Sequence, residues 1–242
     1  GFIAAYVDFL PADVTVRSGR SRSPFELGLD WLVDFKKANF NVRAGEVVGI
    51  AGLMGSGRTE LAMSIFGGSY GRKISGTVKL HGKAIDVSTI DRAIDAGLSY
   101  VTEDRKSLGL ILDETIRFNT TLSNLEAVSS GAVLKRNRET QVAERYREAL
   151  AIRTPSVFQK TVNLSGGNQQ KVVLAKWLFA EPEVLILDEP TRGIDVGAKS
   201  EIFEIMNDLA SKGYGVIFIS SELKESLAMS DRVLVMAKRA LT

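Results

Sequence analysis

The sequence predicts an α/β fold in which a parallel sheet carries an antiparallel β edge and a helical subdomain insertion. Three runs are apolar throughout, as is typical of strands that are buried on both faces of a parallel sheet: residues 184–187, 216–219 and 233–236. An amphipathic helix is predicted between the first two runs, with Ile202 on its apolar face and Gly213 after its end. The order strand, helix, strand indicates parallel strands joined by right-handed crossovers.

Composition narrows the class of protein. A chain of 242 residues with 45% hydrophobic content can form one large domain or two small ones around a sizeable core. Lys and Arg number 31 and Asp and Glu 29, so no broad basic surface argues for a nucleic-acid partner. The absence of cysteine excludes disulfides and thiolate metal sites, and the single histidine, His81, is expected in an exposed turn. No apolar run reaches the roughly 18 residues that span a bilayer, so any membrane association is expected through a partner.

Residues 1–37 are expected to be a linker or N-terminal segment, and residues 38–242 the main domain. Residues 17–24 have the small polar and charged composition of a linker. Because the chain begins at Gly1 rather than Met, we expect it to be a piece of a longer protein.

The main domain is expected to begin with a strand pair around a turn at Ala44-Gly45. Phe40 and Val42 belong to its first strand and residues 47–51 to its second. The elements expected next are a helix over residues 59–66 that ends at Gly67-Gly68, a hairpin over residues 74–87 and a strand over residues 98–102.

A helical subdomain is expected over about residues 104–162, because strand-like runs disappear there. Val142, Tyr146 and Leu150 have helical spacing. The charge run at residues 135–138 is expected to be a solvated face.

Residues 52–60 have the pattern of a phosphate-binding loop with one unusual residue. Gly52 and Gly57 have the usual spacing and Thr59 supplies the hydroxyl, but Arg58 stands where lysine is usual. Glycines let backbone N–H groups face an anion, and the N-terminus of the following helix attracts the same charge. Arg is a planar fork and Lys a compact ammonium, so the change is not conservative. Alone, such a glycine-rich turn is equally compatible with plain packing.

Asp188 and Glu189 follow the apolar run of residues 184–187, at the carboxyl end of the strand. Open parallel sheets bind ligands at that edge. Together with a phosphate loop, this position predicts that Asp188 holds Mg²⁺ and that Glu189 polarises the attacking water. Capping of the next helix is the structural alternative.

Ser165, Gly166 and Gly167 are expected to begin another helix, which runs to Ala180 and stops before Pro182. Ser165 is a good N-cap residue, so an isolated Ser-Gly-Gly would indicate only a tight entry turn. Roughly twenty residues before an Asp-Glu strand end, the same letters have a narrower meaning.

These features resemble, in their order, the nucleotide-binding domain of an ABC transporter, which has a P-loop NTPase fold. Five motifs resemble more narrowly the second, C-terminal cassette of the tandem ATP-binding subunits of bacterial monosaccharide importers (ribose, xylose, arabinose and galactose type). The motifs lie at residues 52–60, 102–106, 164–170, 191–197 and 219–223. The resemblance covers about residues 38–236.

The resemblance implies an ABC-type ATPase that uses ATP and Mg²⁺, with Glu189 as the general base. Trp31 is the candidate for stacking on adenine, and Phe35 is its alternative. The implied nucleotide-binding residues are Gly52, Gly55, Ser56, Gly57, Arg58, Thr59, Glu60, Trp31, Ser165, Gly166, Gly167, Asn168, Gln169, Asp195 and Ser221, and the implied metal-binding residues are Thr59, Glu103 and Asp188.

Three residues depart from the pattern of an active ABC site. Arg58 replaces the loop lysine, Glu103 the glutamine that senses the metal, and Ser221 the switch histidine. Each change alters a group that touches the γ-phosphate. Cassettes of this family pair head to tail, so the intact sequence from Ser165 to Gln169 is expected to face the ATP of a partner cassette.

The resemblance implies that the chain binds ATP and hydrolyses it with a partner cassette to power sugar uptake, as a peripheral protein at the cytoplasmic face of the membrane. The further implied partners are transmembrane permease subunits and, indirectly, a sugar-binding protein, with no nucleic acid. Two alternatives stay open. One is a non-hydrolysing nucleotide-binding half that supplies its signature sequence to the partner site, and the other is a soluble ABC ATPase outside transport.

Overall fold

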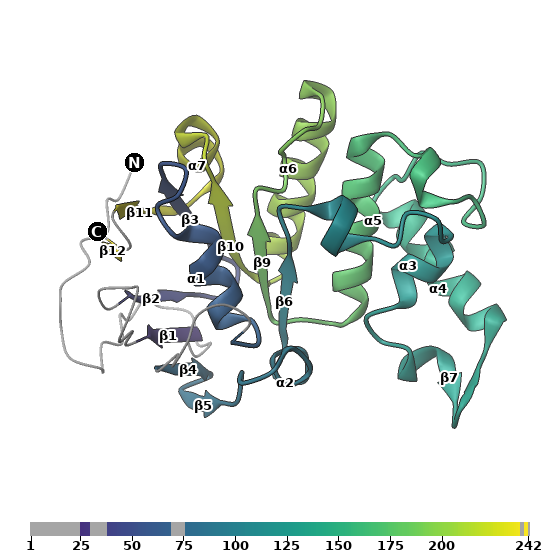
Figure 1. Cartoon of the computed structure of the whole chain (residues 1–242), viewed down its shortest axis with the longest axis horizontal. Coiled ribbons are helices and arrows are strands. Elements are labelled where there is room, and N and C mark those ends of the chain that lie inside the picture. The colour runs from purple at the N-terminus through teal and green to yellow at the C-terminus, as the bar shows by residue number, and fades with distance from the viewer. Residues whose placement is uncertain (1–24, 30–37, 69–75, 238–239, 242) are drawn as a thin grey trace. The chain divides into compact units, whose positions relative to one another are not determined.

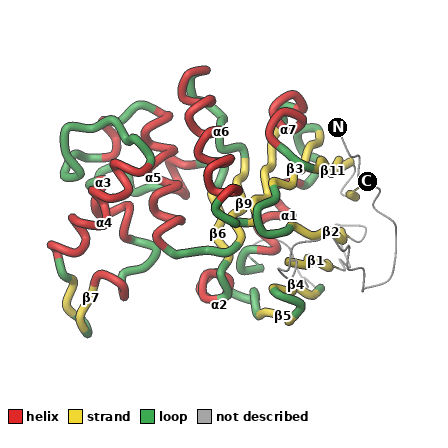
Figure 2. The backbone as a smooth tube through the Cα atoms, turned by 180° about the vertical axis from the view of Figure 1, so that it is seen from behind, coloured by secondary structure: helices red, strands yellow, loops and turns green. Residues whose placement is uncertain are grey.

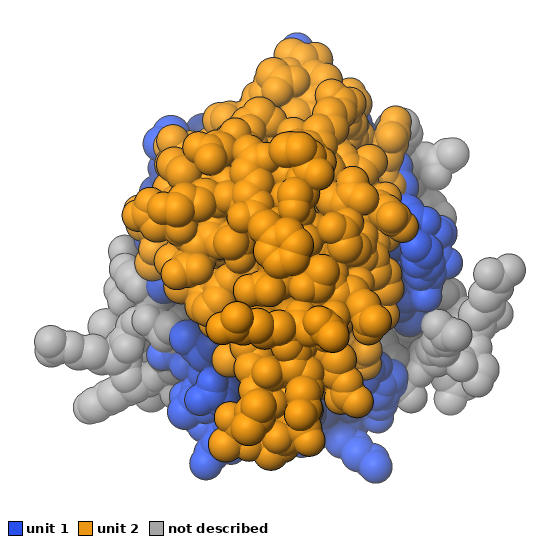
Figure 3. Space-filling model, turned by 90° about the vertical axis from the view of Figure 1, so that its right-hand side faces the viewer, with its two compact units in different colours: residues 1–100, 183–189, 207–242 blue, residues 101–182, 190–206 orange. Residues whose placement is uncertain are grey.

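The computed structural model describes residues 25–29, 38–68, 76–237 and 240–241. The chain divides into two compact units. The first unit takes residues 1–100, 183–189 and 207–242, and the second takes residues 101–182 and 190–206. Figure 3 colours the first unit blue and the second orange.

A six-stranded sheet organises the first unit (Figure 1). The strand order is β12-β11-β3-β10-β9-β6, and β11, β3, β10 and β9 run parallel. The three predicted apolar runs lie in β9, β10 and β11, which confirms the α/β class. All residues of β9 and β10 are buried, which explains why their runs do not alternate. The strands are β3 (Val47–Gly52), β6 (Leu98–Val101), β9 (Val184–Asp188), β10 (Gly215–Ser220), β11 (Arg232–Ala237) and β12 (Ala240–Leu241).

A second sheet of the first unit has the order β2-β1-β4-β5 and antiparallel pairs throughout. It is the predicted antiparallel edge. Its strands are β1 (Phe25–Leu29), β2 (Ala38–Val42), β4 (Thr77–Leu80) and β5 (Lys83–Ile85).

Two predictions about this sheet are wrong. The expected strand pair does not form, because β3 already has β10 and β11 on its two edges and leaves no edge free for β2. Residues 25–29, placed in the linker, instead form β1 between β2 and β4. The rest of the linker prediction lies outside the described residues.

The hairpin of β4 and β5 confirms the predicted turn at His81-Gly82, where both residues have positive φ, 51° and 74°. His81 is exposed, as expected. Its Nε2 lies 2.5 Å from Oε2 of Glu183, a partner that the sequence did not indicate.

Short helices complete the first unit. The predicted helix after the phosphate loop is confirmed as α1 (Arg58–Ile65), and Gly67, which has φ 80°, lies in the turn that follows its end. A Cβ on Gly67 would lie 2.5 Å from the backbone nitrogen of Ile90, so this turn has no room for a side chain. The other helices are α2 (Ile90–Asp95), α7 (Leu223–Met229) and the last part of α6 (Val196–Ser211).

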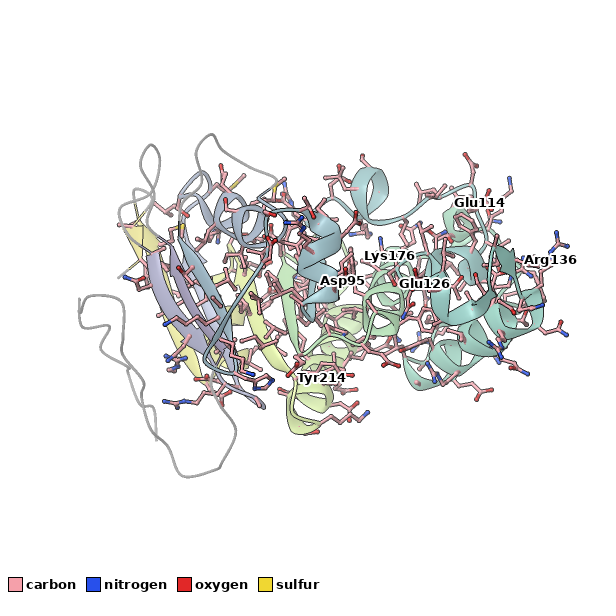
Figure 4. The ribbon with its side chains drawn as sticks, turned by 90° about the horizontal axis from the view of Figure 1, so that it is seen from below. Asp95, Glu114, Glu126, Arg136, Lys176 and Tyr214 are labelled. Carbon is pink, nitrogen blue, oxygen red and sulfur yellow. The ribbon has the colours of Figure 1, made fainter. Side chains whose placement is uncertain are left out.

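The second unit is mainly helical, and it includes residues 104–162, α5 and the start of α6. Helices α3, α4 and α5 pack against one another (Figure 2). The charge run at residues 135–138 is exposed, and Arg136 points outward in Figure 4. The elements are α3 (Ile116–Thr121), α4 (Arg136–Ala149), α5 (Gly166–Phe179), the π-helical turn η1 (Arg105–Gly109), the 3₁₀ turns η2 (Glu126–Val128) and η3 (Thr161–Asn163), and the strands β7 (Ser129–Ser130) and β8 (Val133–Leu134).

Among the described residues, no helix combines the length and the apolar character that crossing a membrane requires.

Candidate functional site

The predicted phosphate loop connects β3 to α1 in the first unit. Gly52 ends β3, and a Cβ there would lie 2.5 Å from the carbonyl oxygen of Met236 and 2.7 Å from Oγ of Ser56. Gly57 is the N-cap residue of α1 and has φ 104°, a conformation that favours glycine. The first N–H groups of α1 have no partner within the helix, so the loop presents them to an anion.

Arg58 is the first residue of α1, but its side chain leads away from the loop. The Arg58 side chain is 8% exposed. Its Nη1 donates a 2.5 Å hydrogen bond to the carbonyl oxygen of Ser220, and its Nη2 lies 3.3 Å from Oε1 of Glu189. The only cationic side chain of the loop is therefore paired with a carboxylate of the same unit.

Glu189 directly follows β9 and has φ 47°, an unusual value for a residue with a side chain. Its backbone N–H donates to Ile219, and its Oε2 accepts a 3.1 Å hydrogen bond from the hydroxyl of Ser221. Burial raises the pKa of the Glu189 carboxyl, while Ser221 and the charge of Arg58 oppose the rise. The structure thus brings together Arg58, Glu189 and Ser221, all predicted site residues.

Asp188 ends β9 and is fully buried. Its Oδ2 accepts a 2.9 Å hydrogen bond from the hydroxyl of Tyr100, whereas its Oδ1 has no hydrogen-bond partner among the described residues. Burial raises the pKa of the Asp188 carboxyl to about 6, against the opposing effect of the Thr59 and Tyr100 hydroxyls. A buried carboxylate oxygen without a partner is costly, so this position favours a bound cation.

Mg²⁺ fits this arrangement. Within the described ranges, no three His, Cys, Asp or Glu side chains form a metal-binding group. Mg²⁺ commonly uses one or two protein ligands and completes its shell with phosphate and water oxygens. Asp188, with its unpartnered Oδ1 and the nearby hydroxyl of Thr59, meets that requirement.

The second unit holds the Ser-Gly-Gly sequence at the start of α5. Ser165 is its N-cap residue, as predicted, and is exposed. The Ser165 Oγ accepts hydrogen bonds from the backbone N–H of Asn168 at 3.5 Å and from its Nδ2 at 2.9 Å. The Oδ1 of Asn168 accepts from the backbone N–H of Arg153 at 2.8 Å. Because its acceptor positions are used, the Ser165 hydroxyl keeps its proton for an outside acceptor.

Two other predicted residues have structural contacts in this unit. Gln169 is buried, and its Nε2 donates to the carbonyl oxygen of Thr161 at 3.3 Å. Asp195 precedes α6, and its Oδ1 accepts a 2.9 Å hydrogen bond from the backbone N–H of Ala198. The contact of Gln169 indicates packing within the unit, and the contact of Asp195 indicates capping of α6.

Glu103, predicted as a metal ligand, forms an ion pair with Arg192 within the second unit. Arg105 donates to the carbonyl oxygens of Arg192 and Gly193, at 2.8 and 3.2 Å. This cluster joins the segment after β6 to the loop before α6. The Glu103 carboxylate, which was predicted to bind a metal, is therefore already paired with the guanidinium of Arg192.

Trp31 and Phe35 lie outside the described residues. Sequence reasoning missed Tyr100, Arg153 and Arg192. Tyr100 lies near the end of β6, which neighbours β9, so its position next to Asp188 follows from strand order. No sequence signal indicated the partners of Arg153 or Arg192.

Comparison with known proteins gives a consistent set of relatives. The family model described as "ABC transporter" matches residues 35–192. The L-arabinose transport ATP-binding protein AraG of Geobacillus stearothermophilus is 61% identical over 84% of this chain and 40% of its own length. The xylose import ATP-binding protein XylG of Thermoanaerobacter pseudethanolicus is 54% identical, and the ribose import ATP-binding protein RbsA of Clostridium perfringens is 52% identical, over 81% and 84% of this chain and 39% and 40% of their own lengths.

The chain therefore spans about 40% of the length of these relatives. A solved nucleotide-free ATP-binding cassette from an ABC transporter is similar in structure, with a TM-score of 0.72 and 19% identity over 90% of this chain and 89% of its own. That likeness supports the fold alone.

Proposed function

The chain belongs to the ABC transporter family, and on this premise we propose that it binds ATP with Mg²⁺ and hydrolyses ATP together with a partner cassette. The observation that carries the proposal is the buried, unpartnered Oδ1 of Asp188 at the end of β9, in the same unit as the phosphate loop and near the Thr59 hydroxyl. Helix N-terminus, hydroxyl and carboxylate form the set that MgATP requires.

Within the loop, the backbone N–H groups at the start of α1 bind the phosphates. Asp188 and Thr59, both in the first unit, would hold Mg²⁺. Bound Mg²⁺ neutralises phosphate charge. We assign to Glu189 the role of polarising the attacking water molecule.

The Ser165 sequence serves a second nucleotide. The Ser165 hydroxyl donates to a phosphate oxygen of the partner cassette's ATP, and the N-terminus of α5 adds the backbone N–H groups of Gly166 and Gly167. Asn168 fixes the hydroxyl in the donating orientation through its two contacts with Ser165 Oγ.

The transported substrate class is a monosaccharide, because the relatives named above are arabinose, xylose and ribose transport proteins. The partners are then transmembrane permease subunits and, indirectly, a sugar-binding protein, and the chain lies at the cytoplasmic face of the membrane. These names argue against a soluble ABC ATPase outside transport. Co-purification with ribosomes or DNA instead of membrane permeases would restore that alternative.

Titration of the 242-residue chain with MgATP tests the binding step. We expect binding by the wild-type chain and a loss of about tenfold or more in affinity for Thr59→Ala, because a metal ligand is removed. Thr140→Ala, on α4, is the matched control and should leave the affinity unchanged. Absence of binding by the wild-type chain would contradict the proposal.

The ATPase rate of the whole ATP-binding protein with its permeases tests the Ser165 role. Asn168→Ala should lower this rate about tenfold or more, because the Ser165 hydroxyl loses its fixed orientation. The MgATP affinity of the 242-residue chain should not change, since Ser165 serves the partner's nucleotide. An unchanged ATPase rate would contradict this role.

A further inference from the structure

We propose that Arg58 is a positioning residue that holds Glu189 and is not a ligand of the nucleotide phosphates. The inference deepens the proposed function and rests on it, because it concerns the same loop. In this proposal the loop backbone and Thr59 bind the phosphates, while the guanidinium of Arg58 binds the carboxylate of Glu189.

The Arg58 side chain extends from α1 towards the ends of β9 and β10. Its backbone belongs to the first turn of α1, but its guanidinium reaches the ends of β9 and β10, where it contacts Glu189 and Ser220. Both terminal nitrogens are used, at 3.3 and 2.5 Å, and the side chain is nine-tenths buried. A planar fork suits two acceptors at once, which the ammonium of a lysine does not match in geometry.

The carboxylate of Glu189 is held from two sides. Arg58 engages Oε1 and Ser221 engages Oε2, so both carboxylate oxygens have partners inside the unit. Arg58 and Ser221 oppose the rise in the Glu189 pKa that burial causes, so with both partners in place the carboxylate is a weaker acceptor for a water proton than burial alone would make it. The arginine at the lysine position and the serine at the histidine position therefore act on the same side chain.

Breaking the buried pair of Arg58 and Glu189 would cost free energy. If Arg58 turned towards a phosphate, Glu189 would stay behind as a buried, unpaired charge, 9% exposed, next to the added negative charge of the nucleotide. Breaking a buried pair in this way is strongly unfavourable. The ion pair is accordingly expected to persist when nucleotide binds, and the Ser220 carbonyl keeps the guanidinium in place.

The test measures the MgATP affinity of the wild-type 242-residue chain and of three variants: Arg58→Met, the double variant with Arg58→Met and Glu189→Gln, and Thr59→Ala. Arg58→Met leaves Glu189 unpaired, and its charge should weaken binding about tenfold. Adding Glu189→Gln removes that charge, so the double variant should return to within about threefold of the wild type. Such rescue is not expected of a phosphate ligand, whose hydrogen bonds a glutamine at residue 189 does not replace. A double variant that stays tenfold or more weaker would overturn the inference.

Thr59→Ala separates this result from a failure of the proposed function. If the wild type binds MgATP and Thr59→Ala loses affinity, but the double variant is not rescued, only the inference fails. If the wild type does not bind, both fail. Should the Arg58 variants not fold, a structure of the wild-type chain with MgATP decides: the Arg58–Glu189 pair within 4 Å supports the inference, and Arg58 on a phosphate oxygen overturns it.

Discussion

The carboxylate of Glu103 forms an ion pair with the guanidinium of Arg192, within one compact unit of the chain. Glu103 stands where the family pattern has a neutral glutamine, so the extra negative charge is balanced by a residue of the loop before α6. The side chains are 32% and 57% exposed, respectively.

Removing this ion pair should change the stability very little. Exposed ion pairs contribute at most about 1 kcal/mol, because water screens both charges. We expect Glu103→Gln and Arg192→Met each to lower the free energy of unfolding, measured by urea titration, by less than about 1 kcal/mol. Arg92→Met is the control for a more exposed pair, since Arg92 and its partner Asp86 are 59% and 55% exposed. A loss of several kcal/mol in the Glu103 variant alone would show a buried structural role.

Gly167 should not tolerate a methyl group. A Cβ at Gly167 would overlap the Cβ of Ala198, where α5 packs against α6. We expect Gly167→Ala to destabilise the chain by about 1–3 kcal/mol through overpacking. Adding Ala198→Gly removes the overlapping methyl group and should recover much of the loss. Thermal unfolding of the single and double variants measures this recovery, and its absence would contradict the packing argument.

Tyr100 should be necessary chiefly because of Asp188. Tyr100→Phe leaves the buried Oδ2 of Asp188 without its donor, which should cost about 1–3 kcal/mol in the free energy of unfolding. In the Asp188→Asn background the buried charge is gone, so the same tyrosine change should cost clearly less. Urea titrations of the four proteins form the double-mutant cycle. Equal costs in the two backgrounds would mean that Tyr100 acts through other contacts.

Lys176 should make the stability depend on alkaline pH. It is buried on α5, where its Nζ donates to Gly109, and it is labelled in Figure 4. Burial lowers the pKa of Lys176 from 10.5 to about 8. Between pH 8 and 10.5 the unfolded chain therefore holds more protons than the folded chain, and the free energy of unfolding rises with pH, by about 3 kcal/mol at most.

Lys176→Met should lack this rise, because it has no proton to lose. Urea titrations at about pH 7.5 and about pH 10, which lie below and above the folded-state pKa of about 8, compare the two proteins. A parallel pH dependence in both would show that the group responsible is not Lys176.

Sequence patterns predicted the elements of this fold well where a single period decides the structure. Continuous apolar runs identified β9 and β10 because parallel strands are covered on both faces. Strand pairing was not predictable in the same way. The pairing of β2 depends on which edges of β3 are already taken, which is a property of the whole sheet.

The candidate site shows the same division. Motif spacing predicted that Asp188 and Glu189 lie at a strand end in the same unit as the phosphate loop. It did not predict the partners of Arg58, because the contacts with Ser220 and Glu189 join segments more than a hundred residues apart in the chain. Long side chains such as arginine select among distant acceptors by geometry that no local pattern records.

Gly52, the first glycine of the phosphate-loop pattern, is required by the packing of the sheet. A Cβ at residue 52 would lie only 2.5 Å from the carbonyl oxygen of Met236, so the packing of β3 alone requires a glycine here. A cassette that had lost all use for ATP would still need this glycine to close its sheet. The first letter of the phosphate-loop pattern thus reports on architecture, and evidence for nucleotide binding has to come from Thr59 and Asp188.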